Sequence, residues 1–194
     1  MAQAIAQRTG EQAASLTQTY ILNSGLVVGG SLLMAACAHV SIPLWFTPVP
    51  ITLQTFGVVF LALTLGGWRA SAALVLYLLE GIAGFPVFSP HGVGGIAQVL
   101  GPTGGYLMSY PFAALLCGYL AEKLSKRSPW IGLTSAALIA ESFILVTGSL
   151  WLMALTHKSP AVIVAAAILP FLPGEILKAA AAAAGARGVR HIAK

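Results

Sequence analysis

Acidic residues are nearly absent from this chain of 194 residues. It contains no aspartate and only five glutamates, and all charged residues together make up 8% of the sequence. Hydrophobic residues account for 58% and the mean hydropathy is +0.88, which is more than a soluble domain of this size needs for its core. The composition therefore excludes an ordinary soluble domain and predicts an all-α, polytopic membrane protein.

Cysteine is equally scarce, because only Cys37 and Cys117 are present and both lie in apolar segments. Two isolated thiols support neither a disulfide framework nor a metal site, so we interpret them as packing residues and expect no metal or cofactor. The chain also lacks a Gly-x-x-x-x-Gly-Lys-Ser/Thr phosphate loop, so it does not hydrolyse ATP by that route. The net charge of +5 is spread over loops and termini, which indicates membrane topology rather than nucleic-acid binding.

Six apolar segments are predicted to be transmembrane helices, at about residues 20–42, 52–66, 70–84, 103–121, 130–155 and 173–189. A helix needs about 20 apolar residues to cross the hydrocarbon core, so the short second and third segments are expected to be buried in a bundle. The segment 160–169 is too short to cross the bilayer and is expected to lie at the membrane surface or to dip into the membrane. Residues 1–19 are polar and are expected to form a loosely ordered cytoplasmic tail without a cleavable signal peptide, followed by one six-helix domain over residues 20–190.

Basic residues predict that both termini lie in the cytoplasm. In that orientation Lys158 alone faces outward, and eight basic residues face the cytoplasm, namely Arg8, Arg69, Lys123, Lys126, Arg127, Arg187, Arg190 and Lys194. Cytoplasmic loops of membrane proteins carry an excess of Lys and Arg. The loops that follow the first, third and fifth spans then face outward.

Two of these outward loops have an unusual composition. Residues 43–51 and 85–102 contain no Asp, Glu, Lys or Arg, and the segment from Gly81 to Gly105 holds eight glycines in 25 residues. Glycine lets a backbone approach a ligand closely, so we interpret these loops as re-entrant or capping segments over a binding site. Alternatively, these glycines only permit tight turns and close contacts between helices. Seven polar residues gather on the same side of the membrane: Thr52, Gln54, Thr55, His91, Gln98, Thr103 and Tyr106.

Glu175 and Lys178 lie three residues apart at the start of the sixth predicted span. Residues at this spacing share one helix face and can neutralise each other. A charged pair inside a membrane segment indicates a ligand or ion site, because an ionised side chain in hydrocarbon is costly. A salt bridge that only holds two helices together is the alternative.

Five motifs in the same order resemble the BioY family, the biotin-binding membrane subunits of energy-coupling factor (ECF) transporters. They are Ser-Ile-Pro-Leu at 41–44, Pro-Val-Pro-Ile-Thr-Leu-Gln-Thr at 48–55, Gly-Ile-Ala-Gly-Phe-Pro-Val-Phe at 81–88, Gly-Pro-Thr-Gly-Gly-Tyr-Leu at 101–107 and Pro-Phe-Leu-Pro-Gly-Glu-Ile-Leu-Lys at 170–178. The resemblance covers about residues 20–185. It implies a six-helix S-component fold in the cytoplasmic membrane, with an outward-facing pocket that binds biotin with high affinity.

The resemblance also implies site residues and partners. The expected biotin-binding residues are Thr52, Gln54, Phe88, Tyr106, Trp151, Glu175 and Lys178. Delivery across the membrane is expected to need a transmembrane coupling subunit and ATPase subunits. Small residues on the first span, at Gly25, Gly29, Ser31 and Ala35, are expected to pack against the coupling subunit, with packing inside the chain as the alternative. The family commonly has Asp where this chain has Glu175.

Three other functions stay open on the residues alone. The chain could capture a different vitamin, or it could be a passive membrane scaffold. An intramembrane hydrolase using Ser31 or Ser109 with His39 is a further hypothesis, but the sequence offers neither an orienting acid nor a Gly-x-Ser-x-Gly elbow. Glu80 and Glu141 depart from the family that the chain resembles, in which these positions are commonly uncharged. The sequence assigns neither of them a role.

Overall fold

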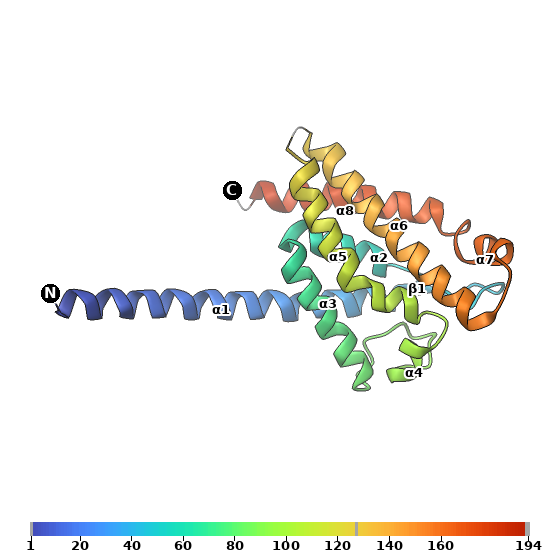
Figure 1. Cartoon of the computed structure of the whole chain (residues 1–194), viewed down its shortest axis with the longest axis horizontal. Helices are drawn as coiled ribbons and strands as arrows, with labels where there is room; N and C mark the ends of the chain where they lie inside the picture. Colours follow the sequence, from blue (N-terminus) through green and yellow to red (C-terminus); the bar gives the residue numbers. More distant parts are fainter. Residues whose placement is uncertain (1, 127, 193–194) are drawn as a thin grey trace.

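The computed structural model of the chain consists mainly of helices. It describes residues 2–126 and 128–192, with side chains described for residues 17–126 and 128–189. Figure 1 shows a bundle of helices from which the first half of one long helix, α1 (Ala2–His39), projects. A helix is present at each of the six segments predicted to span the membrane, namely α1, α2 (Gln54–Leu65), α3 (Gly67–Ile82), α5 (Gly104–Leu124), α6 (Pro129–Thr156) and α8 (Leu172–Ile192).

Three further elements form the connections on one end of the bundle. The predicted short helix is α7 (Pro160–Ala167), and the glycine-rich loop contains a helix of six residues, α4 (Gly95–Leu100). A two-stranded antiparallel hairpin pairs β1 (Ser41–Ile42) with β2 (Ile51–Thr52), with Ser41 opposite Thr52. The sequence predicted neither α4 nor the hairpin, because elements this short carry no measurable hydrophobic period.

Helix length and apolarity differ widely between the spans. Thr17–His39 and Pro129–Thr156 are long and apolar enough to cross a bilayer, and α7 and α8 are so only when taken together as a pair with a bend of 49°. The α2 helix has only 12 residues but occupies the centre, where it packs against α1, α3, α5, α6 and α8. Its apolar side chains are therefore buried by protein, as expected for the short second segment.

The expectation of a loosely ordered segment over residues 1–19 was wrong, because α1 is helical from Ala2. This segment contains no proline and is rich in alanine and glutamine, which favour helix. It continues directly into the first span, so it extends an already nucleated helix.

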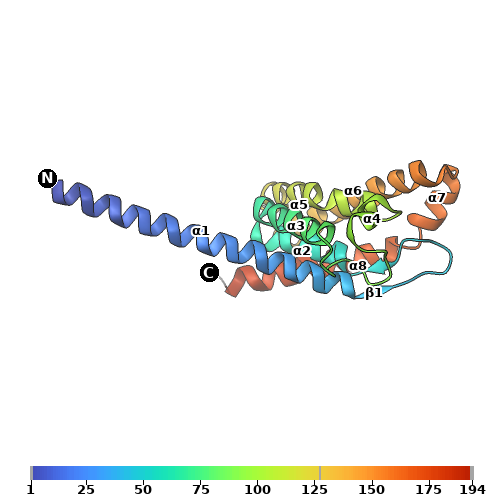
Figure 2. The ribbon, with the colours of Figure 1, turned by 90° about the horizontal axis from the view of Figure 1, so that it is seen from below.

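The two chain ends lie at the same end of the bundle. Figures 1 and 2 show the N- and C-termini on one side and α4, α7 and the loop of the hairpin on the other. Small residues allow the helices between them to approach closely, and Ala113, Ala136 and Ala140 of α5 and α6 are fully buried. The outward-loop elements predicted from the sequence are therefore gathered at one end.

The small residues of α1 divide between two faces. Gly25 and Gly29 are exposed, and a side chain added at either would meet no atom within 4 Å. Ser31 is fully buried and its hydroxyl donates a hydrogen bond to the Glu80 carboxylate on α3. The prediction that Ser31 faces a partner was therefore wrong. Successive residues rotate by about 100°, which turns Ser31 and the half-buried Ala35 away from the exposed glycine face.

Candidate binding site

A pocket opens between the hairpin end of the bundle and helices α2, α5, α6 and α8. The space between its lining residues, including the open mouth, is about 560 Å³. Five of the seven predicted ligand residues line it, namely Thr52, Gln54, Tyr106, Glu175 and Lys178. Apolar lining comes from Val49, Pro50, Leu107, Ile144, Leu145 and Phe171. The remaining lining residues are Thr55, Ser89, Gln98, Thr103, Tyr110 and Glu141.

The charged pair lies in the first two turns of α8. The backbone N–H of Glu175 donates to the Phe171 carbonyl over 3.0 Å, which closes the first turn, and a helix N-terminus favours an acidic side chain. The Lys178 ammonium lies 2.8 Å from Glu175 Oε1 and also donates to Thr55 Oγ1 over 3.0 Å. Lys178 therefore links α8 to α2 across the pocket.

The start of α2 forms a second polar group. Gln54 Nε2 donates to the Tyr77 hydroxyl over 2.8 Å, and Gln54 Oε1 accepts from Thr52 Oγ1 over 3.1 Å. Both polar ends of this buried side chain thus have protein partners. Because Tyr77 belongs to α3, the bond from Gln54 joins two helices.

The α5 helix supplies an aromatic wall through Tyr106 and Tyr110, which are four residues apart and lie on one face. The Tyr106 hydroxyl lies 3.3 Å from Ser149 Oγ. Its ring lies directly against Gly148 of α6, where an added Cβ would come within 2.2 Å of the ring carbons. The absence of a side chain at Gly148 therefore determines how closely Tyr106 approaches α6.

Loop residues cover one side of the pocket. Val49 and Pro50 precede β2, and Ser89 and Gln98 come from the α3–α5 connection. The Ser41 and Ser89 hydroxyls lie 2.9 Å apart, which joins the hairpin to that connection. The two segments predicted to cap a site are thus held together over it.

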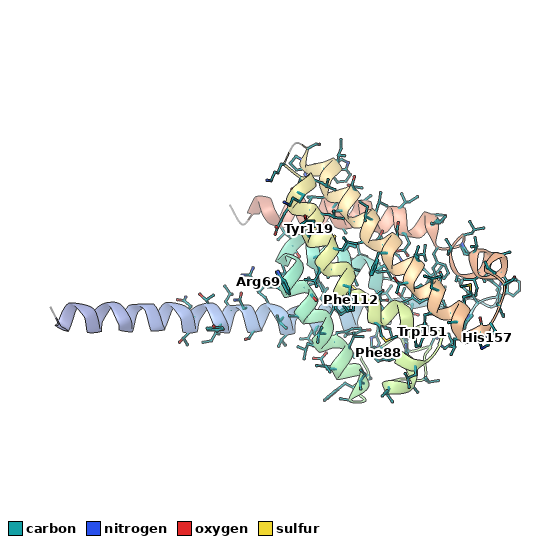
Figure 3. All side chains as sticks on the ribbon, in the orientation of Figure 1. Arg69, Phe88, Phe112, Tyr119, Trp151 and His157 are labelled. Atoms are coloured by element: carbon teal, nitrogen blue, oxygen red, sulfur yellow. The ribbon has the colours of Figure 1, made fainter. Side chains whose placement is uncertain are left out.

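Two predicted ligand residues, Phe88 and Trp151, lie outside the pocket lining. Figure 3 places both towards the α4 end of the bundle. The Phe88 ring packs on Gly81 and meets Tyr77 edge to face, with ring centroids 5.4 Å apart. The Trp151 indole donates to the Gly101 carbonyl over 2.9 Å. Both side chains support the walls and the loop instead of lining the pocket.

Sequence reasoning missed Tyr110 and Glu141. The signal for Tyr110 was its position one helical turn after Tyr106, and the signal for Glu141 was a carboxyl group in the middle of a span. Both Glu141 oxygens and Glu175 Oε2 are buried without a hydrogen-bond partner among the described residues. A pocket with one ammonium and several open acceptors suits a small polar ligand with N–H donors and an anionic group.

A family model described as the BioY family matches residues 11–194. The chain belongs to the BioY family. It is 36% identical over 135 residues to the probable biotin transporter BioY of Pyrococcus horikoshii, covering 70% of this chain and 76% of the relative. It is 30% identical over 164 residues to the biotin transporter BioY2 of Lactococcus lactis, covering 84% and 87%.

The fold agrees with this membership of the BioY family. A crystal structure of the S-component for biotin from an ECF-type ABC transporter superposes with a TM-score of 0.82 at 25% identity, covering 90% of this chain and 93% of that one. The prediction of a multi-pass, all-α membrane protein with the S-component fold is confirmed. The relatives are named transporters, in agreement with the prediction that the chain is not an enzyme.

The hydrolase hypothesis finds no support in the geometry. Ser109 Oγ donates to the Tyr106 carbonyl, Ser31 donates to Glu80, and His39 Nδ1 lies 2.8 Å from the Ala35 carbonyl. Within the part of the chain whose side chains are described, neither serine is hydrogen-bonded to His39. A serine nucleophile needs a base within hydrogen-bond reach.

Proposed function

We propose that this chain captures biotin with high affinity at an outward-facing pocket and takes part in its uptake as the S component of an ECF transporter. The observation that carries the proposal is the partly buried Glu175–Lys178 pair, which lies in a pocket that the two uncharged loops cover. Its relatives are named biotin transporters.

The chemistry of biotin fits this pocket. Biotin has a carboxylate, a ureido group with two donors and one acceptor, and a thin apolar bicycle. Lys178 has three N–H donors, of which two are used by Glu175 and Thr55. The third can meet an anion or the ureido oxygen, while Tyr106, Ile144 and Phe171 cover the apolar part.

The proposed orientation places both termini in the cytoplasm and the pocket at the outer face. The basic residues support it, and so does the position of both termini at the end opposite α4 and the hairpin. In this orientation residues 1–19 lie on the cytoplasmic side as the first part of α1, and residues 20–190 form one transmembrane domain surrounded by lipid.

Transport then needs energy from partner subunits, because the chain has no phosphate loop. We assign the contact with a coupling subunit to the exposed face of α1 around Gly25 and Gly29, where a partner helix can approach closely. ATPase subunits act through that coupling subunit.

A competition experiment tests the ligand. Detergent-purified protein loaded with labelled biotin is challenged with unlabelled biotin, thiamine or riboflavin. Only unlabelled biotin is expected to displace the label. Displacement by thiamine or riboflavin at similar concentrations would assign the pocket to another vitamin, and absence of any saturable ligand would favour a passive scaffold.

A further inference from the structure

Glu141 is a buried acidic residue that the proposed function does not yet use. It lies within α6, is 2% exposed, and lines the pocket together with Glu175 and Lys178. Neither of its carboxyl oxygens has a hydrogen-bond partner among the residues whose side chains are described. A buried polar group without a partner is costly, and native structures leave few of them.

Several side-chain donors around the pocket are already engaged with other groups. Lys178 donates to Glu175 and Thr55, and Gln54 donates to Tyr77. The Tyr106 hydroxyl lies within hydrogen-bond distance of Ser149 and of the Ala167 carbonyl. The titratable groups that line the pocket with Glu141 are Tyr106, Tyr110, Glu175 and Lys178, and no hydrogen bond joins any of them to Glu141 in the described part of the chain.

We propose that Glu141 is a ligand-binding residue that accepts a hydrogen bond from a ureido N–H of bound biotin. This proposal rests on the proposed function. A cyclic urea presents two N–H donors, and the pocket's unpartnered carboxylate oxygens belong to Glu141 and Glu175. The ligand can thus donate to carboxyl oxygens that no described protein group meets. Glu141 on α6 would contact the urea from a different helix than Glu175 on α8.

A purely structural role for Glu141 predicts different contacts. Structural carboxyl groups in a protein interior make ion pairs or hydrogen bonds, as the half-buried Glu80 does with Ser31 in the same protein. Within the described part of the chain Glu141 makes none of these, and its side chain lines the pocket. Removing it should therefore cost ligand affinity and leave the ligand-free fold intact.

The test measures binding of biotin and of its two singly N-methylated ureido derivatives to wild type, Glu141→Ala and Glu141→Gln. Loss of one hydrogen bond to the buried carboxyl group is expected to weaken biotin binding to the Glu141→Ala variant about 3- to 10-fold. Glu141→Gln keeps one acceptor oxygen and is expected to lose less. Glu122→Ala, an exposed position on α5, is the matched control and should bind like wild type.

The methylated ligands separate direct contact from an indirect effect. In wild type, methylation of the nitrogen that faces Glu141 is expected to weaken binding, and in Glu141→Ala that penalty should largely disappear. The melting temperature of the ligand-free Glu141→Ala protein should not fall. If both substitutions leave biotin affinity unchanged, or weaken every ligand equally while lowering the melting temperature, the proposal is overturned. Failure of wild type to bind biotin would instead contradict the proposed function.

Discussion

The Lys178 ammonium donates a hydrogen bond to the Thr55 hydroxyl over 3.0 Å, although the two residues are 123 positions apart in the chain. The same ammonium is paired with Glu175 on its own helix. Because the contact crosses from α8 to α2 at the pocket, Lys178 both neutralises Glu175 and joins the two helices. Its position depends on two helices, and so does the shape of the site.

Replacement of Thr55 by valine tests this cross-helix contact. The substitution keeps the branched shape and removes the acceptor, so Lys178 keeps only Glu175 as a partner. We expect biotin affinity to fall about 3- to 10-fold, which corresponds to one hydrogen bond. Isothermal titration calorimetry measures the change. Thr64→Val is the matched control on α2, because the Thr64 hydroxyl bonds the Phe60 carbonyl of its own helix and lies away from the pocket. Equal losses in both variants would contradict the role of Thr55.

The close contact between Gly148 and Tyr106 predicts a position that tolerates no side chain. In Gly148→Ala the new Cβ would come within 2.2 Å of the Tyr106 ring, so the ring must move into the pocket or the helices must separate. Overpacking of this kind costs about 1–3 kcal/mol. We expect a lower melting temperature and weaker biotin binding.

The control for this substitution is Gly188→Ala on α8, where an added Cβ meets no atom within 4 Å. Alanine is the better helix former, so stability should stay the same or rise. Unchanged binding and stability in Gly148→Ala would show that Tyr106 does not depend on this contact.

The Ser41–Ser89 contact predicts how fast the ligand leaves. These hydroxyls join the hairpin to the α3–α5 connection over the pocket. Ser89→Ala removes the link, and one neutral hydrogen bond corresponds to about a 3- to 10-fold change. We expect this change in the dissociation rate of labelled biotin, with a smaller change in the association rate. An unaltered dissociation rate would mean that the loops are held closed by other contacts.

The exposed face of α1 predicts a substitution that separates capture from transport. In Gly29→Leu a bulky side chain occupies the face assigned to the coupling subunit, while the pocket is untouched. Co-purification with the coupling and ATPase subunits should be lost, and biotin binding by the isolated chain should be unchanged. Gly188→Leu places the same side chain at an exposed position of α8 and should preserve the complex. Loss of the complex in both variants, or in neither, would count against this assignment.

Much of the fold could be predicted from the sequence, because spans are set by apolar length and their ends by proline and glycine. The helix pairing around α2 could not, since an apolar helix shows no preferred face. The direction of Ser31 was misjudged for a related reason. Small-residue spacing identifies a close helix contact but not whether the neighbour belongs to the same chain.

Residue types that are rare in this chain were identified as site residues from the sequence, whereas common residue types were misassigned or missed. Glu175 and Lys178 stood out as charges in an apolar sequence, and both line the pocket. Aromatic residues were harder to assign, because Phe88 and Trp151 serve packing as readily as ligand binding. Glu141 had an evident position but no pattern that assigned a role, and only the pocket geometry relates it to Glu175.

Direct binding of biotin to the purified chain tests the central claim, with Lys178→Ala measured beside wild type. Wild type is expected to bind saturably below micromolar ligand, and Lys178→Ala at least about 100-fold more weakly, because truncation leaves the Glu175 carboxylate buried without its partner. Lys158→Ala, an exposed lysine outside the pocket, should bind like wild type. Absence of saturable binding by wild type at micromolar biotin, or equal affinity in the folded Lys178→Ala protein, would contradict the account.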